Sequence, residues 1–136
     1  MLAKALGVVC IRVSNFLIGS RIRFRAPFDT SIGRVRFFGV DTPERGDKCF
    51  TEATDFTRLL VGSQVRLEDG PRLEDIYGRR LAYIYDTSGN SIDVQLIAGG
   101  FASAWTRDGQ HRDVLIGLEE SAKTNNAGCL WGERLP

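Results

Sequence analysis

The sequence predicts a mainly β member of the α+β class, with five strands closed into a small barrel and three α-helices. Two observations predict it. The first third of the 136-residue chain and two later segments carry the alternating or β-branched patterns of strands. Helical patterns are inserted among these strands and do not alternate with them, which favours a barrel over a parallel doubly wound sheet. A five-stranded barrel of this size is consistent with an OB-fold.

The strands are expected at residues 7–13, 21–26, 34–40, 64–68 and 80–85, with a short extended piece at 101–105. Residues 21–26 alternate cleanly, with Ile22, Phe24 and Ala26 on one face and three arginines on the other. Residues 34–40 run directly into a polar turn, where Pro43 disfavours helix at Thr42.

Three helices are expected at residues 51–61, 92–98 and 111–126. The first has Ala53, Phe56 and Leu60 on one stripe with Leu59 beside them, and Thr51 suits its N-cap. Ser91 suits the cap of the second helix, and glycines end all three patterns. Trp105 is interpreted as a core anchor.

Length and composition bound the function. A chain of 136 residues supports one domain, so residues 1–136 are expected to form a single unit. With 43% hydrophobic and 26% charged residues, it resembles an ordinary soluble globular protein and not a disordered or collagen-like one. The formal charge of +1 does not favour a wholly basic nucleic-acid binder. It conceals a split, because residues 1–40 sum to +6 and residues 41–136 to −5.

The three cysteines, Cys10, Cys49 and Cys129, do not make a complete disulfide framework. Free thiols are the favoured interpretation, and a Cys49–Cys129 bridge in an exported protein is the alternative. The N-terminal apolar run ends at Arg12 without a clear cleavage site, so a strand is expected there and no signal peptide. Location in the cytoplasm or outside the cell stays open, and no stretch approaches the roughly 20 apolar residues of a membrane span.

Two polar clusters are candidates for chemistry. In the first, Arg36 lies on a strand that leads to Asp41, Thr42 and Glu44. An arginine binds phosphate through two parallel hydrogen bonds, a carboxylate and a carbonyl are hard ligands for Ca²⁺, and a second carboxylate activates water. In the second cluster, residues 75–80, a turn presents Tyr77 and Arg79 at the start of a strand. Each cluster alone is an ordinary turn.

Taken together, residues 34–131 resemble the staphylococcal nuclease (thermonuclease) family. The similarity lies in residues 35–44, 52–57, 75–85, 93–102 and 127–131, in family-like order and spacing. It implies an OB-fold barrel with three helices and Ca²⁺-dependent hydrolysis of DNA or RNA. We also expect a monomer that has no membrane partner. Residues 1–33 match the family worst.

The resemblance also implies the site residues. Arg36 and Arg79 would bind the phosphate, Glu44 would activate water, and Tyr77 would contact the nucleotide. Asp41 and the carbonyl of Thr42 would be the Ca²⁺ ligands.

One family feature is missing. The family has an Asp-Gly-Asp-Thr motif between its first two strands, whereas residues 12–20 contain no acid here. Three hypotheses therefore remain: a nuclease, which we favour; a nucleic-acid-binding module of the same fold; and a protein-interaction domain.

Overall fold

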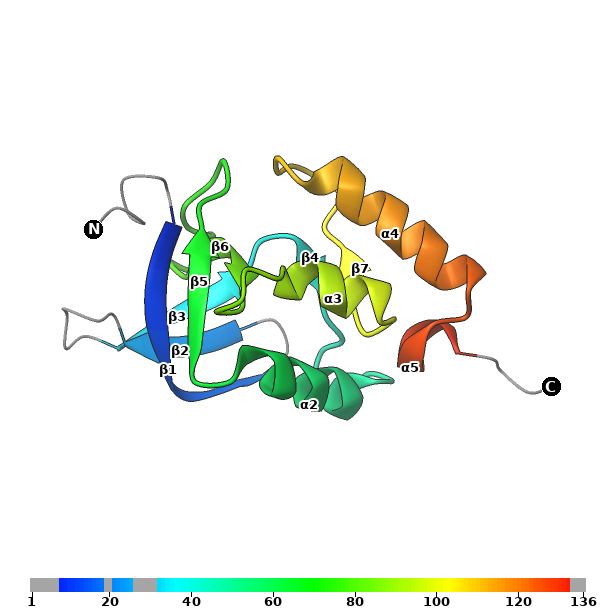
Figure 1. The fold of residues 1–136 in the computed structure, drawn as a ribbon, viewed down its shortest axis with the longest axis horizontal. Helices are drawn as coiled ribbons and strands as arrows, with labels where there is room; N and C mark the ends of the chain where they lie inside the picture. Colours follow the sequence, from blue (N-terminus) through cyan, green and yellow to red (C-terminus); the bar gives the residue numbers. More distant parts are fainter. Residues whose placement is uncertain (1–7, 19–20, 26–31, 133–136) are drawn as a thin grey trace.

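The computed structural model describes residues 8–18, 21–25 and 32–132, and side chains from Val35 onward (Figure 1). The strands are β1 (Val8–Ile18), β2 (Arg21–Arg25), β3 (Ile32–Phe37), β4 (Val40–Asp41), β5 (Gln64–Glu68), β6 (Arg80–Tyr85) and β7 (Ser103–Ala104). The helices are α2 (Phe50–Val61), α3 (Ile92–Ala98), α4 (Arg112–Thr124) and α5 (Gly128–Trp131).

Five of the strands form a closed barrel in the order β1-β2-β3-β6-β5. Strand β1 pairs antiparallel with both β2 and β5, and β2–β3 and β5–β6 are also antiparallel. The ring closes through a parallel pair, β3–β6, in which Val35 lies opposite Arg80 and Arg36 opposite Leu81. The barrel therefore joins two segments that each carry a candidate arginine.

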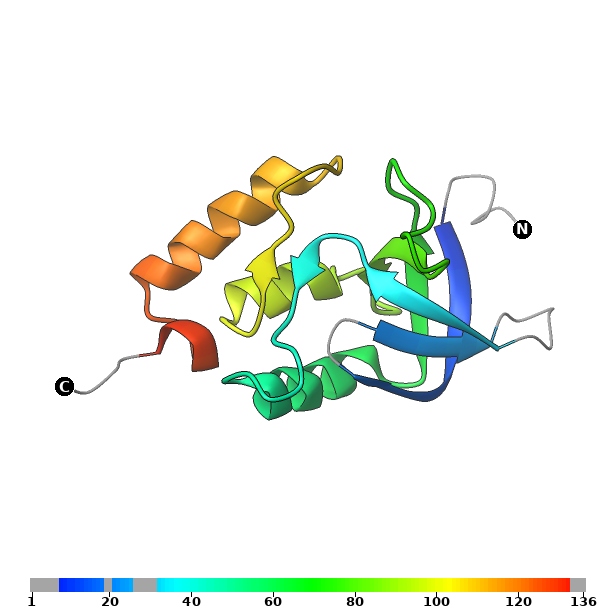
Figure 2. The same cartoon turned by 180° about the vertical axis from the view of Figure 1, so that it is seen from behind.

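The helices cover one side of the barrel. Helix α3 lies between the barrel and α4, and α2 runs along the barrel's edge (Figures 1 and 2). The apolar core is continuous from the barrel into α3 and α4. Its fully buried side chains include Phe37, Leu67, Leu81, Ile84, Ile92, Leu96, Ile97 and Leu115. Each such side chain contributes on the order of 1.5–3 kcal/mol of burial free energy.

The predicted helices are present, with corrections at their ends. Helix α3 has the predicted bounds, and the Ser91 side chain accepts a hydrogen bond from the amide of Val94 at 3.0 Å. Helix α2 begins one residue earlier than predicted, and its N-cap is Cys49 and not Thr51. The described residues contain four helices and not three, because the segment after Ala127 forms the short α5.

Two further expectations were wrong in detail. The strand predicted at residues 34–40 is broken, because the chain bends at Phe38 and Gly39 before β4 begins at Val40 and pairs with β7. In α2, Leu59 is 77% exposed, whereas the rest of the predicted stripe is confirmed, because Ala53 is buried and Phe56 and Leu60 pack against the core. The first departure affects the site, because β4 leads to the polar turn.

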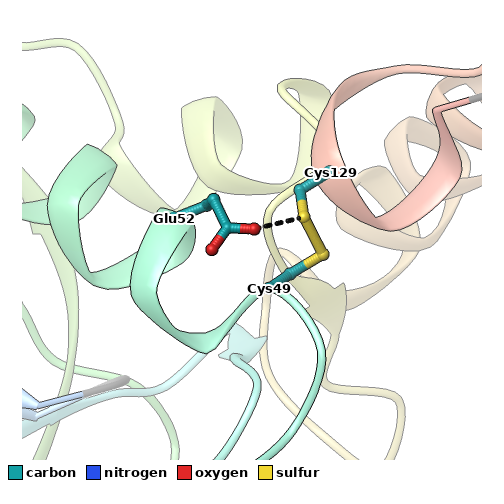
Figure 3. The surroundings of a disulfide bond; sticks show 3 residues. All are labelled: Cys49, Glu52 and Cys129. Atoms are coloured by element: carbon teal, nitrogen blue, oxygen red, sulfur yellow. Dashed lines mark hydrogen bonds between the residues drawn. A yellow bond between two sulfur atoms is a disulfide. The ribbon is translucent and has the colours of Figure 1, made fainter.

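Cys49 and Cys129 form a disulfide, which corrects the preferred interpretation of free thiols (Figure 3). Their Cα atoms are 5.8 Å apart, a separation suited to a disulfide, and the bridge ties the start of α2 to α5. Glu52 Oε2 lies 2.9 Å from Cys129 Sγ, although an oxidised sulfur has no proton to donate. The side chain of Cys10 lies outside the described part.

Candidate active site

Arg79 lines a cavity and is held there by Asp75. The Arg79 Nε atom donates to Asp75 Oδ2 at 2.5 Å, and the backbone amides of Tyr77 and Arg79 donate to Asp75 Oδ1 at 2.8 and 2.9 Å. Burial raises the pKa of Asp75, but these hydrogen bonds outweigh it, so the pKa lies below its ordinary value. The ion pair uses Nε and leaves the two terminal guanidinium nitrogens outside it. The Tyr77 ring lies under the guanidinium, 5.1 Å from the Arg79 carbon to the ring centroid.

Arg36 lies beside this turn because its strand, β3, pairs in parallel with β6. Burial lowers the pKa of Arg36, and the negative charge of Asp41 opposes that effect. The charges of Arg79, Asp75 and Glu44 act on it more weakly. The site therefore collects two arginines and three carboxylates that lie far apart in the sequence.

The turn after β4 presents the remaining candidates. Asp41 and Glu44 are exposed, and Thr42 is 4% exposed, with no hydrogen-bond partner for its hydroxyl among the described residues. The amide of Glu44 donates to Asp47 Oδ2 at 3.0 Å, and the amide of Asp47 returns a bond to the Glu44 carbonyl at 2.9 Å. These bonds fix the backbone at Glu44.

The oxygen donors of this turn fit a hard cation in kind but are few in number. The predicted ligands, the Asp41 carboxylate and the Thr42 carbonyl, are oxygens of the type Ca²⁺ binds, and Ca²⁺ takes 6–8 of them. The buried Thr42 hydroxyl, which has no partner among the described residues, is a further oxygen of this type. Within residues 35–132, only one set of three acidic, histidine or cysteine side chains has its ligand atoms close enough together to hold one metal ion. This set is Cys49, Glu52 and Cys129. That group contains the disulfide and does not include Asp41. The side chains of residues 12–20 lie outside the described part.

A cavity of about 520 Å³ adjoins the two arginines. Sequence reasoning did not identify four of its lining residues: Arg72, Trp105, Arg107 and Asp108. Trp105 was expected in the core, but it is only partly buried and lines this cavity, where its indole nitrogen donates to Asp108 Oδ1 at 2.7 Å.

Arginines surround the Trp105 ring. The guanidinium carbons of Arg36, Arg72 and Arg107 lie 5.6, 5.9 and 5.3 Å from its centroid. Arg72 is also paired with Asp108 through two hydrogen bonds of 2.7 and 3.1 Å. The cavity is therefore lined by four arginines and two aspartates, a set that suits an anionic ligand with a flat apolar part.

Comparison with known proteins agrees with the sequence resemblance. Residues 34–133 match the family model described as staphylococcal nuclease homologue. The chain belongs to this family. It is 30% identical over 105 residues to an uncharacterized endonuclease of Escherichia coli O157:H7, covering 76% of this chain and 65% of the relative. It is 22% identical over 140 residues to endonuclease YhcR of Bacillus subtilis strain 168, covering 91% of this chain and 11% of the relative.

The chain thus spans less than two thirds of the length of both relatives. In the part that the structure describes, no helix is long and apolar enough to cross a membrane.

Proposed function

We propose that this chain is a metal-dependent nuclease that hydrolyses phosphodiester bonds of DNA or RNA on an OB-fold barrel. The observation that carries the proposal is that Arg36 and Arg79 line one cavity, while the charges of Asp41 and Glu44 act on Arg36. Family membership and two relatives named as endonucleases support it.

In the proposed reaction, Arg36 and Arg79 bind the phosphate and stabilise the negative charge that grows on its oxygens. Glu44 takes a proton from a water molecule, whose oxygen attacks phosphorus while the bond to the leaving oxygen breaks. Tyr77 contacts the adjoining nucleotide. Asp41 and Thr42 would hold Ca²⁺, which when bound supplies further positive charge to the phosphate.

The proposal predicts Ca²⁺-dependent cleavage that fails when either key side chain is changed. We expect Arg79→Ala and Glu44→Gln each to lower kcat/KM at least about 100-fold, the loss typical of removing one transition-state contact or a proton acceptor. The measurement is cleavage of a fluorescent single-stranded oligonucleotide with Ca²⁺ and with chelator. Arg58→Ala and Glu120→Gln, on the exposed faces of α2 and α4, are the matched controls.

Variants at Arg79 and Glu44 that keep the wild-type rate would contradict these roles. Equal cleavage in Ca²⁺ and in chelator would contradict the metal requirement.

A nucleic-acid-binding module of the same fold is the second candidate. It is favoured by the small number of oxygen ligands near Asp41 among the described residues. Such a module would bind the oligonucleotide, more weakly as salt rises, without cleaving it. Cleavage by the wild type that Glu44→Gln abolishes would exclude it.

A further inference from the structure

Asp93 is a fully buried carboxylate that joins two separate segments of backbone. It lies in the first turn of α3 and is 1% exposed. Its Oδ1 atom accepts the amide of Ile84 at 2.8 Å, and its Oδ2 atom accepts the amide of Gly39 at 3.1 Å. One side chain therefore connects β6 to the residue that precedes β4.

Gly39 is held on every side. Its carbonyl accepts the amide of Trp105 at 2.9 Å, and the preceding amide, of Phe38, donates to the Ala82 carbonyl at 2.8 Å. A Cβ atom at Gly39 would lie 2.6 Å from Leu115 Cδ1 and 3.0 Å from Asp93 Oδ2. The backbone at Gly39 is thus enclosed, and Asp93 supplies the acceptor for its amide.

The two segments joined by Asp93 are those that carry the candidate site. Gly39 lies two residues before Asp41 and three after Arg36, while β6 begins directly after Arg79. We propose that Asp93 is a positioning residue, whose carboxylate fixes the β4 turn relative to β6 and so aligns Asp41 with the two arginines. This inference rests on the proposed nuclease function.

A neutral side chain of the same size does not replace this carboxylate. Each of its oxygens accepts one amide, whereas an asparagine in the same place would meet one of the two amides with its own N–H groups. Burial raises the pKa of Asp93 to about 7, and the backbone hydrogen bonds partly oppose that rise. The titratable groups that interact with it are Tyr83, Tyr85 and His111.

The test compares Asp93→Asn with Asp86→Asn. Asp86 also accepts two backbone amides, those of Ser88 and Asn90 at 2.9 Å, but in an exposed turn at the opposite end of β6 from Arg79. We expect folded Asp93→Asn to lose at least about tenfold in kcat, with a flatter pH profile near neutrality, because small misplacements of reacting groups are costly. The control should stay within about twofold of wild type.

The failures of the two proposals differ. A wild type that does not cleave with Ca²⁺ contradicts the nuclease function whatever the variant does. A wild type that cleaves, together with a folded Asp93→Asn of equal rate and equal pH profile, overturns the role of Asp93.

A second measurement does not need the variant to fold. In wild-type protein, the NMR amide signals of Gly39, Ile84 and Asp41 should shift with pH at one common midpoint, because all three depend on the state of one carboxyl. If the Gly39 and Ile84 signals shift together while the Asp41 signal does not, the hydrogen bonds of Asp93 do not affect the site and the inference is wrong.

Discussion

Asp75 and Asp93 show how the donors around a carboxylate determine its pKa. Both accept hydrogen bonds from backbone amides, but Asp75 also accepts one from the charged side chain of Arg79, and the pKa of Asp75 is lowered. Asp93 receives only neutral amides in full burial, and its pKa is raised. The surroundings of Asp75 favour its ionised form, whereas ionised Asp93 carries the cost of removing a carboxylate from water.

The raised pKa of Asp93 predicts an unusual dependence of stability on pH. The folded state binds the Asp93 proton more tightly than the unfolded state, in which the pKa of this side chain is near 3.8. The stabilisation that this proton gives the folded state is therefore lost as pH rises from about 4 to about 7. We therefore expect the difference in unfolding free energy between wild type and Asp93→Asn to narrow over that range. Urea denaturation at several pH values measures it.

Asp86→Asn again serves as the control. The pKa of Asp86 is lowered, chiefly by the hydrogen bond from the Asn90 amide. The contribution of Asp86 to the free energy of unfolding therefore changes only below about pH 4. A difference between wild type and Asp93→Asn that stays constant from pH 4 to 7 would contradict the raised pKa.

Among the elements, α2 and α5 depend on each other through the disulfide. Cys49 and Cys129 are separated by 80 residues, and the bridge restricts a loop of that length in the unfolded chain. We expect Cys49→Ala/Cys129→Ala to lower the free energy of unfolding by about 2–5 kcal/mol. Urea denaturation measures the loss, and hydrogen exchange should show it first in α5.

Wild-type protein reduced by a dithiol is the matched comparison, because it loses the same constraint without a change of sequence. Equal stability of the oxidised protein and the double variant would mean that the bridge does not restrain the chain.

Elements specified by local signals were predicted well. Strand β5 has the predicted bounds because its alternation is complete within the segment, and β6 because its run of apolar and aromatic residues is continuous. Helix α3 has its own cap in Ser91. The start of α2 was missed because Cys49, bonded to a residue 80 positions away, precedes it. The bend at Gly39 was missed because its amide is bound by Asp93, 54 residues away.

At the scale of the molecule, the net charge of +1 hides a local concentration of arginines in the cavity. If a single-stranded ligand contacts only these, two to four phosphates are bound, and log K should fall with log salt at a slope of about −1.4 to −2.8. Binding of an oligonucleotide to Glu44→Gln in chelator, measured by fluorescence anisotropy, tests this. Arg107→Ala should reduce the slope by about 0.7.

A slope much steeper than this would contradict binding through the cavity alone. It would point to additional contacts by the six basic residues of residues 1–40 other than Arg36, which already lines the cavity.

Within the candidate site, too, residues in short sequence motifs were predicted and residues brought together only by the fold were missed. Six site residues were predicted because each belongs to a short motif, and their roles remain predictions. They are Arg36, Asp41, Thr42, Glu44, Tyr77 and Arg79. Arg72, Trp105 and Asp108 were not identified because no motif links them, and only the folding of two loops brings them together. Asp93 was assigned to a helix pattern, and its partners are set by the tertiary structure.

The parallel pairing of β3 with β6 makes the two candidate arginines, Arg36 and Arg79, a reporter of barrel closure. Strand β3 ends before the chain makes α2, β5 and β6, and its pairing with β6 is one of the five pairings that close the ring. A ligand held by both Arg36 and Arg79 would therefore bind states in which β3 and β6 are paired, and not states in which the barrel is open between them. By mass action such a ligand would favour completion, so a phosphate analogue would act as a folding aid as well as an inhibitor.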